Sequence, residues 1–324
     1  MQNVDKLRTI FLQYLEENCF DQAPQGLYEP VNYILSIGGK RMRPVMLLLA
    51  CQMFKDEVNG ALPAALAVEI FHNFTLLHDD IMDDANLRRG KPTVHEKYDT
   101  NTAILSGDVM MIYAYHYLSK SSNHLIVKLL NILNRIAIGV CEGQQYDMNF
   151  ETSDTVTIPE YLHMIEYKTA VLLSGSMEMG ALIGGASEGD AQHVANFGRD
   201  IGIAFQLQDD ILDTFGDPEK FGKKVGGDII QNKKTFLVLK TLELAKLADA
   251  ENLRALMQTP TTNPSDKIQQ VKALFNQYNI RNIAEKKMET YLSNALAHLD
   301  AIKVVDDRKT EMRDLAHYLI KREV

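Results

Sequence analysis

The fold is decided by residues 59–84, which read NGALPAALAVEIFHNFTLLHDDIMDD. Apolar residues recur here at three- and four-residue steps, which predicts one buried or amphipathic helix: Leu66, Ile70, Phe74, Leu77 and Ile81. Asn59-Gly60 and Pro63 mark its start, since proline is well tolerated in the first turn of a helix. Near its end stands the pentad Asp79-Asp80-Ile81-Met82-Asp83, of pattern D-D-x-x-D. Helical positions four apart share a face, so Asp79 and Asp83 should point the same way.

The same pattern returns at Asp209-Asp210-Ile211-Leu212-Asp213. A second apolar helical stripe leads into it, comprising Val194, Phe197, Ile201 and Phe205. Like charges four residues apart weaken a helix by roughly 0.2–0.5 kcal/mol per pair. One such pentad is compatible with a solvated surface, but two within apolar helices indicate a shared cation. Mg²⁺ prefers oxygen ligands and often joins one or two carboxylates to substrate phosphates.

Helical periodicity continues elsewhere, and convincing strands are absent from the pattern. Thr157-Ile158-Pro159-Glu160 predicts a capping box. The helix that it opens is expected to carry Tyr161, Met164, Ile165 and Leu172. Long loops are expected over 88–94, 149–157 and 213–234. We therefore predict an all-α chain, with one domain over residues 1–324 and ten or more helices.

Basic motifs accompany the acidic ones. Gly38-Gly39-Lys40-Arg41-Met42-Arg43-Pro44 is a glycine turn that leads into a helix start, where free N–H groups favour anions. Arg88-Arg89-Gly90-Lys91 follows the first pentad, and Lys223-Lys224 and Lys233-Lys234 follow the second. Each set alone is compatible with a solvated surface. The repeated order of acids, loop and cations favours a site for magnesium and phosphate.

Composition narrows the function classes. The 324 residues are 46% hydrophobic and 24% charged, which is ordinary for a soluble globular protein. The net charge of −9 argues against general nucleic-acid binding. The three cysteines form no C-x-x-C pair, which fits a reducing, cytoplasmic setting. No apolar stretch approaches the length of an uncharged transmembrane segment, so no membrane-spanning helix is expected.

From Gly38 to Arg322 these motifs, in this order, resemble the all-trans prenyl diphosphate synthases, also called polyprenyl or isoprenyl diphosphate synthases. The resemblance implies an isoprenoid synthase bundle of helices around a deep central cavity, usually in a homodimer. It also implies an enzyme that joins isopentenyl diphosphate to an allylic diphosphate, either dimethylallyl, geranyl or farnesyl, and releases diphosphate. Three Mg²⁺ ions per active site are implied, and Mn²⁺ is an alternative.

The resemblance assigns roles residue by residue. The metal-binding aspartates would be Asp79, Asp80, Asp83, Asp209, Asp210 and Asp213, although not all of them would touch metal directly. The cations that hold the allylic diphosphate would be Arg88, Lys168 and Lys233. The isopentenyl diphosphate site would comprise Lys40, Arg43, His72 and Arg89. Six-residue spacing does not put His72 and His78 on one face of a helix, so a shared zinc site is not expected. Without the resemblance, each would be interpreted as a hydrogen-bonded structural histidine.

Five further positions match the family less centrally. Thr169 and Gln206 correspond to polar groups that face the carbocation. Lys223 corresponds to a lysine on a loop that closes over the site, and Asp228 to an acid of the second diphosphate–metal region. Arg322 lies in a basic C-terminus similar to tails that cover isopentenyl diphosphate in some members.

Product length is expected to depend on Phe74 and Thr75, which precede the first pentad by five and four positions. In the family, aromatics at both positions often stop growth at fifteen carbons, and here only Phe74 is aromatic. Twenty carbons, as in geranylgeranyl diphosphate, are therefore favoured over fifteen, as in farnesyl diphosphate. Longer products stay open, and so does the reading of Phe74 as ordinary core.

Three other classes of protein share part of this pattern. A terpene cyclase would share the first pentad but not the second pentad or the isopentenyl diphosphate cations. A non-catalytic partner subunit would tend to lose one pentad. A Mg²⁺-dependent phosphatase or Nudix-like hydrolase would not need two separated D-D-x-x-D helices.

Overall fold

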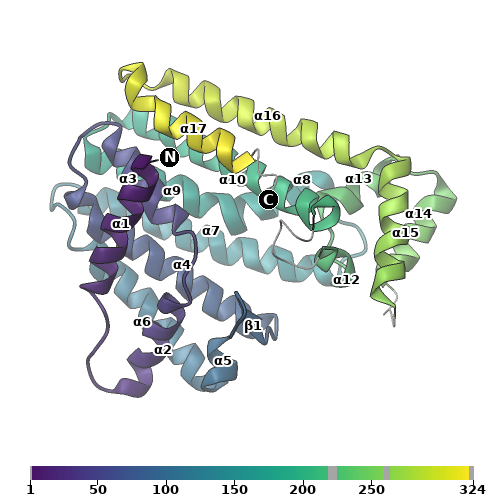
Figure 1. Ribbon diagram of the computed structural model, residues 1–324, viewed down its shortest axis with the longest axis horizontal. Helices are drawn as coiled ribbons and strands as arrows, with labels where there is room; N and C mark the ends of the chain where they lie inside the picture. Colours follow the sequence, from purple (N-terminus) through teal and green to yellow (C-terminus); the bar gives the residue numbers. More distant parts are fainter. Residues whose placement is uncertain (1, 218–224, 259–262, 321–324) are drawn as a thin grey trace. The chain divides into compact units, whose positions relative to one another are not determined.

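The computed structural model describes residues 2–217, 225–258 and 263–320 (Figure 1). Its α-helices are α1 (Gln2–Glu16), α2 (Gln25–Ser36), α3 (Met42–Gln52), α4 (Leu62–Met82), α5 (Val94–Lys97), α6 (Thr100–Leu118), α7 (Ile126–Thr152), α8 (Ile158–Ile165), α9 (Val171–Gly184), α10 (Glu188–Phe215), α12 (Gly227–Ile230), α13 (Phe236–Leu244), α14 (Leu247–Gln258), α15 (Pro264–Gln277), α16 (Ile280–Ala301) and α17 (Thr310–Ile320). Short 3₁₀ turns cover Asn59–Ala61 and Asp306–Lys309, a π-helical segment covers Glu166–Ala170, and the strands are β1 (Leu87–Arg88) and β2 (Lys91–Pro92). The predicted all-α class with ten or more helices is confirmed.

Backbone contacts group the chain into two compact units. Unit 1 comprises Met1–Arg135, Gly175–Ala195 and Ala301–Met312. Unit 2 comprises Ile136–Ser174, Asn196–Asp300 and Arg313–Val324. The first pentad belongs to unit 1 and the second to unit 2. The single domain and the deep central cavity expected from the sequence stay predictions.

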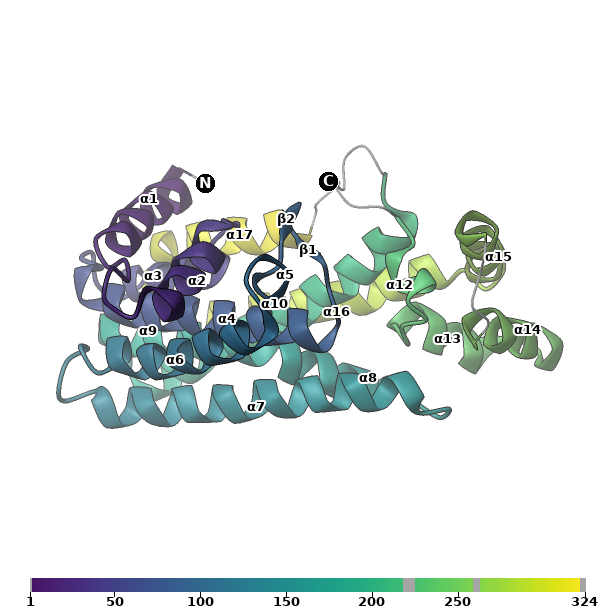
Figure 2. The same cartoon turned by 90° about the horizontal axis from the view of Figure 1, so that it is seen from below.

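Helix α4 forms the centre of unit 1, with α6 alongside it (Figure 2). Leu66, Ile70 and Leu77 are fully buried, as the apolar stripe predicted. The segment Asn59–Met82 is long and apolar enough to span a membrane by length and composition, but 67% of its apolar window is buried in the protein. It also carries Glu69 and Asp80, both buried. We therefore interpret α4 as a core helix.

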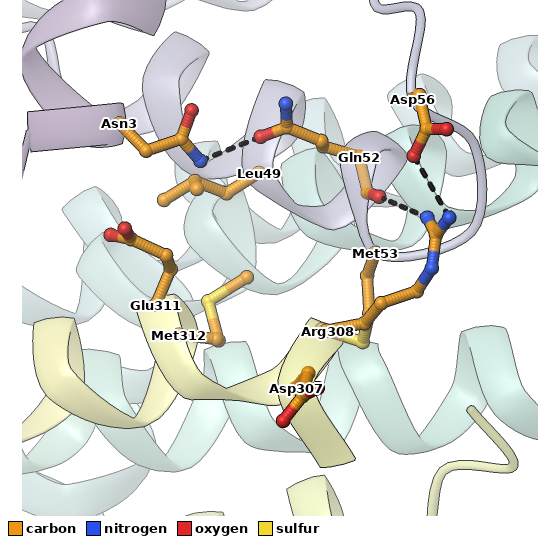
Figure 3. Close-up of a pocket in the computed structure, with 9 residues that line it drawn as sticks. All are labelled: Asn3, Leu49, Gln52, Met53, Asp56, Asp307, Arg308, Glu311 and Met312. Carbon is orange, nitrogen blue, oxygen red and sulfur yellow. Dashed lines mark hydrogen bonds and ion pairs between the residues drawn. The ribbon is translucent and has the colours of Figure 1, made fainter. Parts of the chain in front are cut away.

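The chain returns to unit 1 at Ala301–Met312, where Arg308 ties it to the end of α3. The Arg308 guanidinium donates to the backbone oxygen of Gln52 at 3.1 Å and to the Asp56 carboxylate at 2.8 Å (Figure 3). A cavity of about 310 Å³ lies beside these contacts. It contains no residue of the first pentad.

Unit 2 has its own apolar core, built partly from α8, α10, α13 and α15. The capping box is confirmed, since Thr157 and Glu160 bond to each other's backbone N–H groups at the start of α8. The helix ends earlier than expected, at Ile165, and Leu172 lies in α9. Between them the backbone forms the π-helical segment Glu166–Ala170.

The expected long loops are shorter than the sequence suggested. Helix α7 continues to Thr152 and α10 to Phe215, while α12 forms within the third expected loop. In the first, β1 and β2 pair as a small antiparallel hairpin, so the expectation of no strands was wrong at this point. Its turn residues Arg89 and Gly90 have φ values of 53° and 76°. Two consecutive positive φ values are typical of type I′ hairpin turns, which favour the sequence Asn-Gly. Because this turn has Arg-Gly instead, the sequence indicated a hairpin here only weakly.

Candidate functional site

The first pentad lies at the carboxyl end of α4. Asp79 and Asp80 occupy its last turn, and Asp83 is the C-cap residue. Asp80 is buried, and the Arg88 guanidinium donates to both of its carboxylate oxygens at 2.7 Å. This fork-to-fork geometry is the strong form of an arginine–carboxylate pair. Asp83 is solvent-exposed and Asp79 is half-buried. The three aspartates of one motif therefore have three different environments.

The hairpin directs two consecutive arginines to different partners. Arg88 binds Asp80, whereas Arg89 donates to the backbone oxygen of Gly38. A side chain at Gly39 would collide with the Arg89 guanidinium, and Gly39 has a φ of 133°. Glycine at this position therefore allows the basic turn before α3 to approach the hairpin closely.

His72 lies inside a group of arginines. Its Nε2 lies 3.0 Å from Arg43 Nη1. Burial, followed by the positive charges of Arg43, Arg89, Arg88 and Arg41, holds the pKa of His72 well below its usual range. A neutral imidazole is thus expected at pH 7, and Nε2 can accept a hydrogen bond from Arg43. Burial also lowers the pKa of Arg43 to about 10.

Arg41 was missed as a site residue by the sequence analysis. It is buried, pairs with the buried carboxylate of Glu69 and donates to the backbone oxygen of Leu35. Asn73 donates to the same Glu69 carboxylate at 3.0 Å. A buried arginine paired in this way orders the turn that carries Lys40 and Arg43. The signal was present, since Arg41 stands between those two residues, but the motif does not tell a buried cation from an exposed one.

We call Arg41, Arg43, Arg88, Arg89 and His72 the arginine cluster. Glu69 and Asp80 each pair with one of its guanidinium groups, on Arg41 and Arg88. Arg43 also keeps a buried Nε atom without a hydrogen-bond partner among the described residues. Grouped cations in partly buried surroundings, with an unpartnered donor, fit an anionic ligand that forms several charge-assisted hydrogen bonds. Lys40 is exposed on the adjoining turn, where Arg8 donates to its backbone oxygen at 3.2 Å.

The second pentad has a different set of partners. Asp210 is buried on α10 and accepts from the Tyr161 hydroxyl, from Phe236 N at 3.4 Å and from Gln206 Nε2 at 3.4 Å. All three donors are neutral. Burial raises the pKa of Asp210 to about 8. The hydrogen bond from Tyr161 acts to lower this pKa, whereas the negative charge of Asp228 acts to raise it. Burial likewise raises the pKa of Tyr161 well above its usual range. The sequence predicted Tyr161 only as an apolar position of a helix, and the structure adds that its hydroxyl donates to Asp210.

The last aspartate of the second pentad organises the chain that follows it. Asp213 Oδ2 accepts from Asp228 N at 3.0 Å, at the start of α12, and the Asp213 backbone oxygen accepts from Gly226 N at 2.6 Å. Lys233 N donates to the Asp228 backbone oxygen at 2.9 Å, and the Lys233 ammonium lies 3.9 Å from the Asp228 carboxylate. Asp213, Asp228 and Lys233 are thereby brought together. Asp209 is half-buried on the preceding turn of α10.

Lys168 and Thr169 lie on the π-helical segment, a kind of backbone that is frequent at functional sites. Lys168 pairs with Asp147 of α7. Thr169 Oγ1 lies 3.4 Å from Gln206 Oε1, which links this segment to the partners of Asp210. An added side chain at Gly143 of α7 would collide with the Lys168 backbone. This close contact fixes the position of the segment, and the sequence did not reveal it.

The two chain-length candidates lie on α4 before the pentad. The Phe74 ring is partly buried, with its centroid 5.7 Å from that of Phe71 and 4.7 Å from that of His78. Thr75 Oγ1 donates to the His72 backbone oxygen at 2.8 Å. His78 Nε2 lies 3.3 Å from the backbone oxygen of Ile104 on α6. Phe74 therefore packs against two rings of its own helix and stays partly exposed.

The donor set of both pentads fits a hard divalent cation. Within residues 2–217, 225–258 and 263–320, no three His, Cys, Asp or Glu side chains group closely enough to hold a metal alone. Mg²⁺ commonly takes only one or two protein carboxylates and completes its shell with substrate phosphate and water. Asp79 and Asp83 in unit 1, and Asp209 and Asp213 in unit 2, can supply such oxygens. Lys223 and Arg322 lie outside the described residues.

Comparisons with known proteins show which family the chain resembles. Residues 24–275 match the model of the polyprenyl synthetase family. The chain is 38% identical to a geranylgeranyl diphosphate synthase of Methanosarcina mazei, with 93% of this chain and 91% of the relative covered. It is also 38% identical to one from Sulfolobus acidocaldarius, with 91% of each covered. A crystal structure of a geranylgeranyl pyrophosphate synthase superposes with a TM-score of 0.95 at 43% identity, with 99% of each chain covered.

Proposed function

Because the chain belongs to the polyprenyl synthetase family, we propose that it is a trans-prenyltransferase that makes geranylgeranyl diphosphate. It joins isopentenyl diphosphate to an allylic diphosphate and releases diphosphate. The similarity to geranylgeranyl diphosphate synthases over nine-tenths of the chain carries this proposal. The presence of both pentads and of the arginine cluster in this chain supports an active enzyme.

In this proposal the arginine cluster binds isopentenyl diphosphate. Arg43 and Arg89 donate to its phosphate oxygens, with Lys40 adding charge from the exposed turn. Neutral His72 orients Arg43, because an imidazole that bears no charge can accept from a guanidinium without repelling it. Arg41 and Glu69 hold the turn in place.

Asp79 and Asp83 of the first pentad, and Asp209 and Asp213 of the second, would hold Mg²⁺ with the allylic diphosphate, and Mn²⁺ is an alternative. When bound, the metal supplies positive charge for the departing diphosphate. Arg88, Lys168 and Lys233 donate to the same diphosphate and stabilise its developing negative charge. The allylic C–O bond breaks, the double bond of isopentenyl diphosphate attacks the cation, and transfer of a proton to the departing diphosphate restores a double bond. Thr169 and Gln206 present neutral oxygens to the cation.

Phe74 limits the length of the product in this proposal. It lies five residues before Asp79, about 7.5 Å along a helix axis. Thr75 is small and keeps its hydroxyl on the backbone of α4, so it leaves room beyond the position where an aromatic would stop growth. Twenty carbons are expected rather than fifteen.

We also propose that the enzyme is a cytoplasmic homodimer. Ile104, Leu105 and Ile112 on one face of α6 are 42%, 59% and 65% exposed. Large apolar side chains grouped at the surface are typical of protein–protein contacts. Light scattering of the purified chain should give twice the mass of one chain, whereas Ile112→Glu should shift the protein toward single chains.

The function is tested by chromatography of the products made from labelled isopentenyl diphosphate with dimethylallyl, geranyl and farnesyl starters. A dominant twenty-carbon product is expected. Phe74→Ala should lengthen the product, and the matched Thr75→Phe should shorten it. A dominant product beyond twenty-five carbons, or no shift in Phe74→Ala, would overturn the assignment of Phe74. Release of diphosphate without incorporation of isopentenyl diphosphate would overturn the proposed function.

A further inference from the structure

Unit 2 contains a cavity of about 310 Å³ that the proposed reaction does not use. Three helices line it, namely α8, α13 and α16. Its lining residues are Ile158, Phe236, Lys240, Ile283, Lys286, Lys287 and Thr290. It contains none of the pentad aspartates, and its volume lies at the lower end of the range of small-molecule sites.

The apolar part of this cavity comes from one residue of each helix. Phe236 is buried, while Ile158 and Ile283 are partly buried and pack against the core of unit 2. On α16, Ile283 and Thr290 are seven residues apart with Lys286 and Lys287 between them, so all four share one face of the helix. The cavity therefore combines an apolar surface with ammonium groups.

The positive charge of the cavity is only partly balanced. Lys240 pairs with Glu243 at 2.9 Å. The Lys287 ammonium lies 5.3 Å from the ring centroid of Tyr291. In the described part of the chain, no ion pair joins Lys286 or Lys287 to a carboxylate, and no residue of the lining is acidic. The chain as a whole has a net charge of −9, whereas the lining of this apolar cavity is positively charged through its three lysines.

We propose that this cavity binds an amphipathic anion, with a phosphate or carboxylate head on the three lysines and an alkyl chain on Ile158, Phe236 and Ile283. Lysine binds phosphate as a point charge, and its ammonium group offers three donors. The apolar surface distinguishes such a ligand from inorganic phosphate, because contact with it rewards a hydrocarbon chain. Both a free alkyl phosphate and an anionic lipid headgroup have this chemistry.

The test is calorimetric titration of the full chain with dodecyl phosphate, below the concentration at which it forms micelles and with EDTA present. Lys286→Glu/Lys287→Glu should weaken binding by at least about tenfold, since hydrogen bonds to charged groups contribute about that much each. Ile283→Ser should also weaken it. The matched variant Lys55→Glu/Lys246→Glu changes two exposed lysines elsewhere and should bind like the wild type. Arg43→Ala should also retain binding, which separates this cavity from the arginine cluster.

Two further arms distinguish the sources of the ligand. Sedimentation of the wild type, but not of Lys286→Glu/Lys287→Glu, with phosphatidylglycerol vesicles would assign the cavity to a lipid headgroup. Binding of dodecyl phosphate without sedimentation would assign it to a free amphiphile. Absence of binding, or equal affinity in the wild type and Lys286→Glu/Lys287→Glu, would overturn the proposal. Prenyl transfer by this double variant should stay within about twofold of the wild type, so the proposed function is judged separately.

Discussion

The two pentads share one pattern and differ in what surrounds their buried aspartate. In the first, Asp80 is paired with a guanidinium, and three more arginines lie close to the same helix. In the second, Asp210 accepts only from a hydroxyl, an amide and a backbone N–H among the contacts that the structure describes. Burial is the same in both cases, so the partner decides how each charge is stabilised. An identical motif therefore does not imply identical roles for its members.

This difference divides the aspartates into two kinds. Asp80 and Asp210 fix neighbouring elements, the hairpin in the first case and α8 with α13 in the second. Asp79 and Asp209, each one position earlier, are half-buried and better placed to meet a ligand. The predictions below test that division, starting with the largest effect.

Asp79→Asn and Asp209→Asn should each lower the rate of prenyl transfer by about 10²- to 10³-fold, the cost typical of removing one group that stabilises developing charge. The measurement is the initial rate of isopentenyl incorporation at saturating Mg²⁺. Asp84→Asn is the control, because Asp84 is exposed beside the first pentad but outside its pattern. Asparagine also tolerates the positive φ of 48° at this position. An equal loss of prenyl-transfer rate in Asp84→Asn would contradict the assignment of the metal-binding aspartates by the D-D-x-x-D pattern.

Asp80→Asn should destabilise the protein by about 1.5–3 kcal/mol, because it leaves the Arg88 guanidinium without its charged partner. Asp210→Asn should cost less than about 1 kcal/mol. The new amide keeps an oxygen for Tyr161 and Phe236, and the Gln206 amide can rotate to accept from the new NH₂ group. Urea unfolding of both variants checks the comparison. If Asp210→Asn were the more destabilising change, the proposed difference between the pentads would fail.

The smallest effect concerns pH. The pKa of His72 lies well below 6.5 in the folded protein, whereas an unfolded histidine titrates near 6.5. Below pH 6.5 the unfolded chain therefore binds a proton that the folded chain does not, so stability falls as the pH falls. Between pH 6.5 and 5.5, the wild type should lose about 1 kcal/mol more than His72→Gln. His124→Gln, at an exposed histidine, should follow the wild type. Identical pH profiles for wild type and His72→Gln would show that His72 is not held neutral.

The sequence predicted the helices that carry both pentads because their apolar stripes are long and regular, as in α4 and α10. The resemblance to a known family assigned Arg43, His72 and Arg89 to one expected site, and the structure places these three residues close together. Local details were not predictable from periodicity. The Arg89-Gly90 turn uses an uncommon residue pair. The π-helical segment at Lys168 lies in close contact with Gly143 of α7, which is 25 positions earlier in the sequence. The Tyr161–Asp210 contact likewise depends on tertiary packing.

The most direct test of the account is a magnesium titration of the purified, metal-stripped chain with labelled isopentenyl diphosphate and dimethylallyl diphosphate. We predict no incorporation in EDTA, saturable recovery as Mg²⁺ is added, and growth of the product to twenty carbons. Incorporation that is independent of Mg²⁺, or Mg²⁺-dependent release of diphosphate without chain growth, would contradict the account.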